Sequence, residues 1–123
     1  MFVLIGEETF SAAEEFAYDL QALGRGTLIG QRTRGGAHMS VWVPVTPHFD
    51  VSVPYARALN PITGTNWEGT GVQPDVEVPA EAAFDRACEL ALRAVAESPA
   101  AARPEFRDEI QQALGDLGAA NDK

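Results

Sequence analysis

The fold of this chain is decided by residues 7–15, which read Glu-Glu-Thr-Phe-Ser-Ala-Ala-Glu-Glu. The apolar run Phe2–Ile5 ends just before this stretch, and a segment with helical periodicity begins inside it. Ser11 and Glu14 form the pattern Ser-x-x-Glu, which is typical of a capping box at a helix start. A serine at such a corner is also well placed to be a nucleophile, because free amides and the positive helix end lie beside it. The pattern alone leaves both roles open.

The composition describes a soluble globular chain of about one domain. The 123 residues are 46% hydrophobic and 22% charged, with a net charge of −9. The acidic residues are spread along the chain and basic clusters are missing, so nucleic acid is not an expected partner. No run approaches the roughly 20 apolar residues of a membrane-spanning helix, and the first residues lack the basic start and the length of a signal peptide. The single Cys88 falls at a helical core spacing, which favours a small buried residue over a reactive thiol.

Hydrophobic periodicity predicts an α/β fold. Two short apolar runs, Phe2–Ile5 and Thr27–Gly30, flank helical spacing over residues 12–23, which predicts a right-handed strand-helix-strand crossover in a parallel sheet. Residues 31–37 form a glycine-containing loop after the second strand, at the edge where open α/β sheets place their ligands. Alternation over residues 41–53 predicts a half-exposed β-hairpin.

The second half of the chain is predicted to contain one long loop and two helices. Residues 55–75 show no periodicity and are rich in turn formers, and long ordered loops in compact domains are usually functional. A brief strand is expected at residues 76–78. Helical spacing then predicts helices over residues 81–97 and 103–117.

Three motifs occur in order along the chain. Residues 9–16 read Thr-Phe-Ser-Ala-Ala-Glu-Glu-Phe, residues 24–38 contain Gly-Arg, Leu-Ile-Gly and Gly-Gly-Ala-His, and residues 68–75 read Glu-Gly-Thr-Gly-Val-Gln-Pro-Asp. Together they resemble the carboxyl-terminal-processing, or tail-specific, serine peptidase family, in particular its branch resembling interphotoreceptor retinoid-binding protein and tricorn protease. The likeness covers about residues 2–95. Three motifs in the right order and spacing are more specific than any one alone.

The resemblance implies a fragment with a ClpP/crotonase-like core, and a nucleophile at Ser11. The backbone amide of Ala12 is implied as a donor to the oxyanion. The glutamate of the family's Glu-x-x-Gly-Val-x-Pro-Asp segment matches Glu68, whose implied role is to orient a neighbouring group, with an exposed loop acid as the alternative. One branch of the family carries a lysine in the stretch corresponding to residues 33–37. This chain has no lysine there, so the Ser/Lys dyad is absent.

The general base is expected before residue 1, because the other branch carries its histidine and a supporting serine earlier in the chain. His48 lies in a hairpin turn and is expected to face solvent. His38 follows the glycine loop and is interpreted as a pocket or structural histidine, with a base role as the alternative. Gly35 and Gly36 are the other candidate residues of the substrate pocket. No cofactor and no metal ion are expected.

The resemblance therefore implies a serine peptidase that cleaves peptide or protein substrates near their carboxyl termini. Residues 1–97 are interpreted as the C-terminal part of its catalytic domain, and residues 98–123 as a linker, an amphipathic helix and a disordered tail. Such a truncated domain is expected to have little activity alone, with a complementing amino-terminal segment or an oligomer as further partners. Relatives are often exported, but this chain leaves its compartment open.

Two other hypotheses stay open. The retinoid-binding relatives hold apolar ligands, so the chain could be a non-catalytic binding module for a retinoid or fatty acid. Phe10, Trp42, Phe49 and Trp67 are the candidates to line such a cleft, although core packing is the commoner duty of aromatic residues. Alternatively, the chain is a misread reading frame whose unpaired sheet edges leave it unfolded or aggregating.

Overall fold

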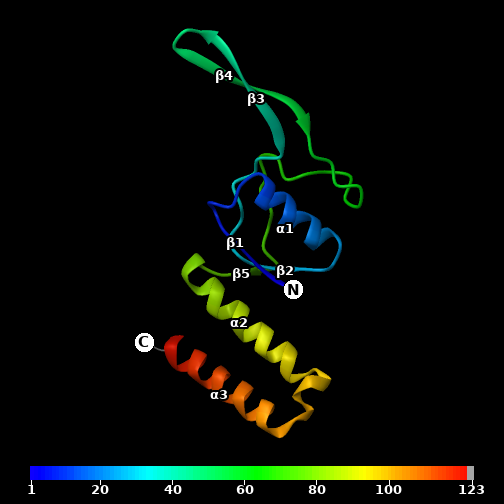
Figure 1. Ribbon diagram of the computed structural model, residues 1–123, viewed down its shortest axis with the longest axis vertical. Coiled ribbons are helices and arrows are strands. Elements are labelled where there is room, and N and C mark those ends of the chain that lie inside the picture. Colours follow the sequence, from blue (N-terminus) through cyan, green and yellow to red (C-terminus); the bar gives the residue numbers. More distant parts are fainter. Residues whose placement is uncertain (122–123) are drawn as a thin grey trace.

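A small parallel sheet lies at the centre of the molecule, with one helix on each side (Figure 1). The computed structural model describes residues 1–121. Strands β1 (Phe2–Ile5), β2 (Thr27–Gly30) and β5 (Val76–Glu77) form this sheet in the order β1-β2-β5. Helix α1 (Ala12–Ala22) connects β1 to β2 on one side, and α2 (Ala80–Ala96) packs against β1 and β2 on the other.

The crossover from β1 through α1 to β2 follows directly from the apolar pattern. The two strands pair in parallel, from Phe2 with Thr27 to Ile5 with Gly30. Leu28 and Ile29 on the central strand are completely buried, as a strand covered on both faces requires. The predicted parallel strand-helix-strand unit is therefore confirmed.

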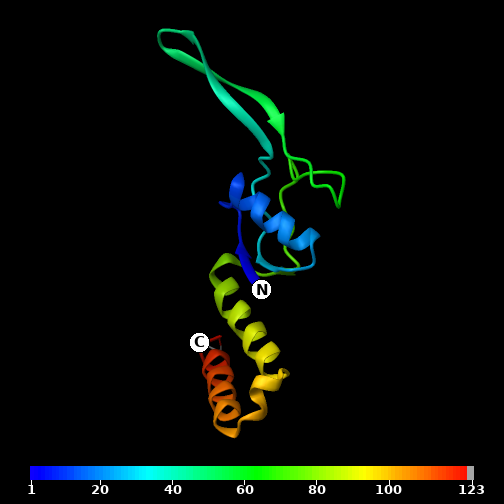
Figure 2. The same ribbon diagram turned by 45° about the vertical axis from the view of Figure 1, so that its right-hand side comes forward.

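The β-hairpin extends away from the sheet (Figures 1 and 2). Its strands β3 (His38–Thr46) and β4 (Phe49–Arg57) pair antiparallel with each other and form a sheet of their own. Valines share one face of it, as the pairs Val41 with Val53 and Val43 with Val51 show. The prediction of a half-exposed hairpin is wrong, because no layer of the described residues covers either face, and the valines are 40–49% exposed.

The C-terminal residues form a helical hairpin that packs on the far side of the sheet. Helix α2 is followed by a short 3₁₀ turn, η1 (Pro99–Ala102), and by α3 (Pro104–Asn121), which returns along α2. Helix α3 continues past its predicted end at Leu117, so residues predicted as the start of a disordered tail are helical. Residues 122–123 lie outside the described part. Within that part no helix is long and apolar enough to cross a membrane.

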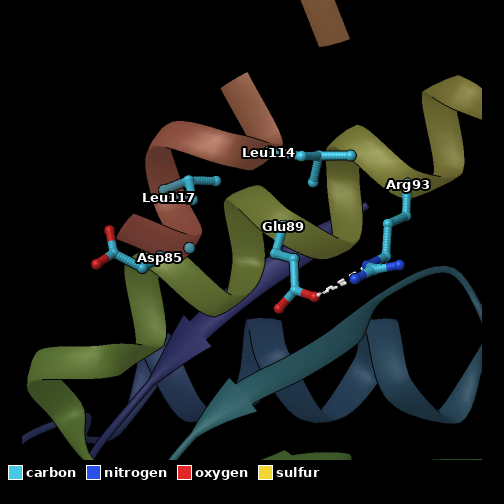
Figure 3. A pocket seen from close by; sticks show the side chains of 6 residues that line it. Asp85, Glu89, Arg93, Leu114 and Leu117 are labelled. Carbon is cyan, nitrogen blue, oxygen red and sulfur yellow. Dashed lines mark hydrogen bonds and ion pairs between the residues drawn. The ribbon is translucent and has the colours of Figure 1, made fainter. Parts of the chain in front are cut away.

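A cavity of about 210 Å³ lies between α2 and α3 (Figure 3). Leucines 114 and 117 of α3 form one wall, and charged residues of α2 form the other. Glu89 on α2 accepts hydrogen bonds from Arg86 and Arg93, and these bonds hold the pKa of Glu89 below its ordinary value. The cavity contains none of the predicted site residues.

Candidate active site

Ser11 stands on the corner between β1 and α1 in a strained backbone conformation. It is the residue that precedes the first turn of α1, and its φ of 57° and ψ of −121° lie in a region that side chains rarely adopt. Every other positive φ in the described residues belongs to a glycine. The Ser11 side chain is exposed. A strained, exposed serine between a strand and a helix is the geometry of a nucleophile elbow.

Glu14, one turn into α1, is completely buried and binds four donors. Its Oε2 accepts the Ser11 N–H at 2.8 Å and the Gly36 N–H at 2.9 Å. Its Oε1 accepts the Thr33 hydroxyl at 2.5 Å and the Gly35 N–H at 2.6 Å. We call these four bonds the Glu14 clamp. The clamp joins the corner that carries Ser11 to the loop after β2.

The pKa of Glu14 reflects two opposed effects. Burial raises it, because the charged form loses its hydration. The hydrogen bonds from Thr33, Gly36, Gly35 and Ser11 stabilise the charged form and outweigh burial, so the pKa lies below its ordinary value. Glu14 is therefore an ionised carboxylate whose charge is balanced by hydrogen-bond donors.

Thr33 extends the clamp to a third segment of the chain. Its hydroxyl donates to Glu14 and accepts the Val72 N–H at 2.7 Å, while its own N–H donates to the Val72 carbonyl at 3.1 Å. The motif at residues 68–75 is thereby tied to the corner that carries Ser11. Sequence reasoning assigned Glu14 only a capping role and missed Thr33, because a hydroxyl in a glycine loop gives no periodic signal.

Thr33→Val is expected to lower the free energy of unfolding by about 1–3 kcal/mol. The replacement keeps the shape of the side chain but leaves the buried Val72 N–H without its acceptor and Glu14 without one donor. Urea titration followed by circular dichroism measures the change. The control Thr65→Val removes an exposed hydroxyl and is expected to stay within about 0.5 kcal/mol. Equal losses in the two variants would contradict the role given to Thr33.

Glu68 anchors the start of the hairpin. Its Oε2 accepts the Ala37 N–H at 2.6 Å and the His38 N–H at 3.1 Å. Its Oε1 lies 3.6 Å from Nδ1 of the His38 side chain. The adjacent Trp67 is buried, and its indole N–H donates to the Gly36 carbonyl at 3.1 Å. Residues 67 and 68 thus hold the backbone of residues 36–38 by three hydrogen bonds.

A cavity of about 240 Å³ opens in front of Ser11. Four of the residues predicted for the site line it, namely Ser11, Ala12, Gly36 and His38. Ala12 is the first residue of α1, so its N–H is one of those that a helix leaves without an internal partner. Two predicted residues do not line the cavity. Gly35 instead donates to Glu14, and Glu68 reaches the site through His38.

The four aromatic residues considered for an apolar cleft are not gathered at one place. Trp67 is buried beneath the loop at residue 36, and Phe10 packs against Gly36. Trp42 and Phe49 lie on the hairpin, 73% and 71% exposed. The hairpin carries Trp42 and Phe49 away from the sheet, whereas Trp67 lines the cavity in front of Ser11. His48 lies at the hairpin turn and is exposed, as predicted.

Comparison with known proteins identifies the family. The family model that matches is peptidase family S41, over residues 1–78. A photosystem II D1 C-terminal processing protease is 34% identical with a TM-score of 0.55, covering 65% of this chain and 20% of that protein. Mature CPAF is 30% identical with a TM-score of 0.52, covering 67% of this chain and 16% of that one.

A further structure of mature CPAF, complexed with lactacystin, shows similarity of fold alone. It is 19% identical with a TM-score of 0.58, over 99% of this chain and 21% of that protein. The chain therefore spans about a fifth of the length of these proteases. The family model, in contrast, accounts for more than half of the 123 residues. This chain belongs to peptidase family S41.

Proposed function

We propose that this chain is the nucleophile-bearing part of a serine peptidase that cleaves peptide or protein substrates near their carboxyl termini. The observation that carries the proposal is the strained, exposed Ser11 at the mouth of a cavity, beside the first-turn N–H of Ala12. Cleavage near carboxyl termini is suggested by the name of the D1 C-terminal processing protease, which describes that protein.

The proposed reaction is acyl transfer through Ser11. Its Oγ forms a bond to the carbonyl carbon of the scissile peptide, and the Ala12 N–H stabilises the oxyanion that develops. The carbon–nitrogen bond then breaks, and the amine leaves with the proton that the serine has released. Water attacks the resulting ester and restores the hydroxyl. The Glu14 clamp takes no part in bond making, but it keeps the Ser11 backbone and the loop in place.

An additional segment of protein is proposed to complete the domain at the free edge of β1. Met1 and Ile5 accept hydrogen bonds from the β2 side, so the alternating pattern turns the backbone groups of Phe2 and Leu4 toward the open edge. A groove of about 550 Å³ runs along β1 between exposed side chains of Leu4, Phe10 and Phe16. The D1 C-terminal processing protease, of which this chain covers only 20%, contains additional residues that can pair with such an edge. The isolated part is therefore expected to have little activity.

A fluorophosphonate probe tests this function, since it forms a covalent bond only with an activated serine. We expect Ser11 to be labelled slowly in the 123-residue chain and faster once a separate amino-terminal segment that completes the domain is supplied. Ser11→Ala is expected to abolish labelling, whereas Ser40→Ala, which alters an exposed serine of β3, is expected to leave it unchanged. Absence of Ser11 labelling both with and without the amino-terminal segment would overturn the proposal.

A further inference from the structure

We propose that Glu15 determines which substrate side chain enters the cavity in front of Ser11, and that it selects lysine or arginine. The side chain in question belongs to the substrate residue that supplies the scissile carbonyl. The inference rests on the proposed nucleophilic role of Ser11 and adds a substrate class to it. Its starting point is that Glu15 and Ser11 line the same cavity.

Helix α1 places Glu15 one turn beyond Ser11. The Glu15 N–H donates to the Ser11 carbonyl at 3.0 Å, which is the hydrogen bond of residues four apart in a helix. Such residues stand one above the other on the same side of the helix. The neighbouring Glu14 is buried and bound by four donors, whereas Glu15 is exposed and its carboxylate makes no hydrogen bond or ion pair within residues 1–121.

The rest of the cavity wall is apolar or already paired. Apolar surface comes from four of its residues, namely Ala37, Met39, Ala58 and Trp67. The indole N–H of Trp67 donates to the Gly36 carbonyl, so it is not available to a ligand. Nδ1 of His38 lies 3.6 Å from the Glu68 carboxylate, which opposes any positive charge on that ring. Among the residues that line the cavity, Glu15 therefore supplies the one carboxylate, on an otherwise apolar wall.

Neighbouring charges strengthen the preference for a cation. Arg34, in the loop after β2, does not line the cavity, and its guanidinium pairs with Glu8 at 2.9 Å and lies over the Phe10 ring. It is therefore not placed to neutralise Glu15. The chain as a whole carries a net charge of −9, which attracts cationic substrates and repels anionic ones.

Lysine and arginine match this combination of an apolar wall and one carboxylate. Their methylene stems pack on apolar surface while the charged end reaches a polar group. A neutral aliphatic side chain fits the same wall but gains nothing from Glu15. An acidic side chain is repelled, so Glu15 discriminates both by attracting one charge and by excluding the other.

The test uses three diphenyl phosphonate esters that differ only in a lysine, norleucine or glutamate side chain. The phosphorus of each ester forms a bond to Oγ of Ser11 as phenol leaves with the serine proton. Labelling rates are measured with and without the added amino-terminal segment. We expect the lysine ester to label Ser11 about 3–10-fold faster than the norleucine ester, and the glutamate ester to be the slowest. Added salt should reduce this ratio.

Variants of Glu15 assign the preference to its charge. In Glu15→Gln the ratio of the lysine to the norleucine rate is expected to fall to about one, and Glu15→Lys should favour the glutamate ester over the lysine ester. The control Glu7→Gln removes the same charge from an exposed residue of the same corner that does not line the cavity. It is expected to keep the ratio of the unmodified chain.

The outcomes separate this inference from the proposed function. A fluorophosphonate that labels Ser11, together with a ratio near one or no labelling by the lysine ester, overturns the inference and leaves the proposed function intact. An unchanged ratio in Glu15→Gln does the same, even if all probes react more slowly, since Glu15 would then act only on the helix start. An equal loss of ratio in Glu7→Gln would assign the preference to net charge and also overturn it. No labelling of Ser11 by any probe, with or without the segment, overturns both.

Discussion

Glu14→Gln is expected to lower the free energy of unfolding by about 2–6 kcal/mol, although it changes one atom of a side chain. Each carboxylate oxygen of Glu14 accepts two donors. The NH₂ group of glutamine replaces one of these oxygens, so it must face either two N–H groups or the Thr33 hydroxyl and one N–H. At least two donors that are partly or fully buried lose their acceptor, and each such loss costs about 1–3 kcal/mol. The variant is also expected to label poorly at Ser11, because the clamp no longer holds the corner to the loop.

Glu14 also makes the free energy of unfolding depend on pH. The pKa of Glu14 is lower in the folded chain than its ordinary value of 4.5, so at pH values between these two pKa values the folded state binds fewer protons than the unfolded state. The stabilisation from Glu14 is therefore complete above about pH 4.5 and is lost as the pH falls through the folded pKa. The difference in stability between the unmodified chain and Glu14→Gln should shrink over this acidic range.

Urea titrations at several pH values measure both effects, and Glu15→Gln is the matched control. Glu15 is the next residue on α1 but is exposed, so its replacement is expected to change stability by no more than about 0.5 kcal/mol. If Glu14→Gln and Glu15→Gln were equally stable and showed the same pH dependence, the clamp would not exist in solution.

Gly71→Ala is expected to cost about 2–5 kcal/mol, combining backbone strain with a collision. Its φ of 68° is unfavourable for alanine, and the added methyl group would overlap the carbonyl oxygen of Thr33. That oxygen is the Thr33 carbonyl, and the Gly35 and Gly36 amides of the Glu14 clamp follow shortly after it in the chain. The backbone at Thr33 therefore cannot shift without disturbing the clamp. We therefore expect both lower stability and slower labelling of Ser11.

Gly69→Ala separates the two causes. Gly69 has a φ of 69°, almost the same as that of Gly71, but a methyl group at this position meets nothing within 4 Å. It should show only the strain, about 1–2 kcal/mol. Urea titration of both variants gives the comparison. A loss at Gly71 no larger than that at Gly69 would show that the close packing against Thr33 is absent.

A buried carboxylate, Glu14, assembles the site. The three segments of the site are far apart in the chain, and Ala37, Trp67 and Val72 join them to Ala17 of α1 in one buried hydrophobic cluster. The carboxylate of Glu14 and the hydroxyl of Thr33 supply the bonds between them, while Glu68 secures the start of the hairpin. A site held by charge-assisted hydrogen bonds keeps its groups in a fixed geometry, as catalysis requires.

The hairpin shows where periodic patterns stop being informative. Alternation correctly predicted which of its residues share a face, because successive side chains of a strand point to opposite sides. It could not predict whether another layer covers that face, since this depends on elements elsewhere in the chain. The valine face was therefore expected to be covered and is instead exposed in the described residues.

The corner at residues 7–15 shows the same division. The sequence by itself determined the parallel crossover, the start of α1 and the position of Ser11 on the corner, because apolar spacing and capping are properties of neighbouring residues. Only the tertiary structure decided what Glu14 binds besides the Ser11 N–H. Its partners at Thr33, Gly35 and Gly36 are 19–22 residues away and are mostly backbone amides, which carry no side-chain signature. Folding alone brings such donors to a carboxylate, because a buried charge is stable only where enough donors surround it.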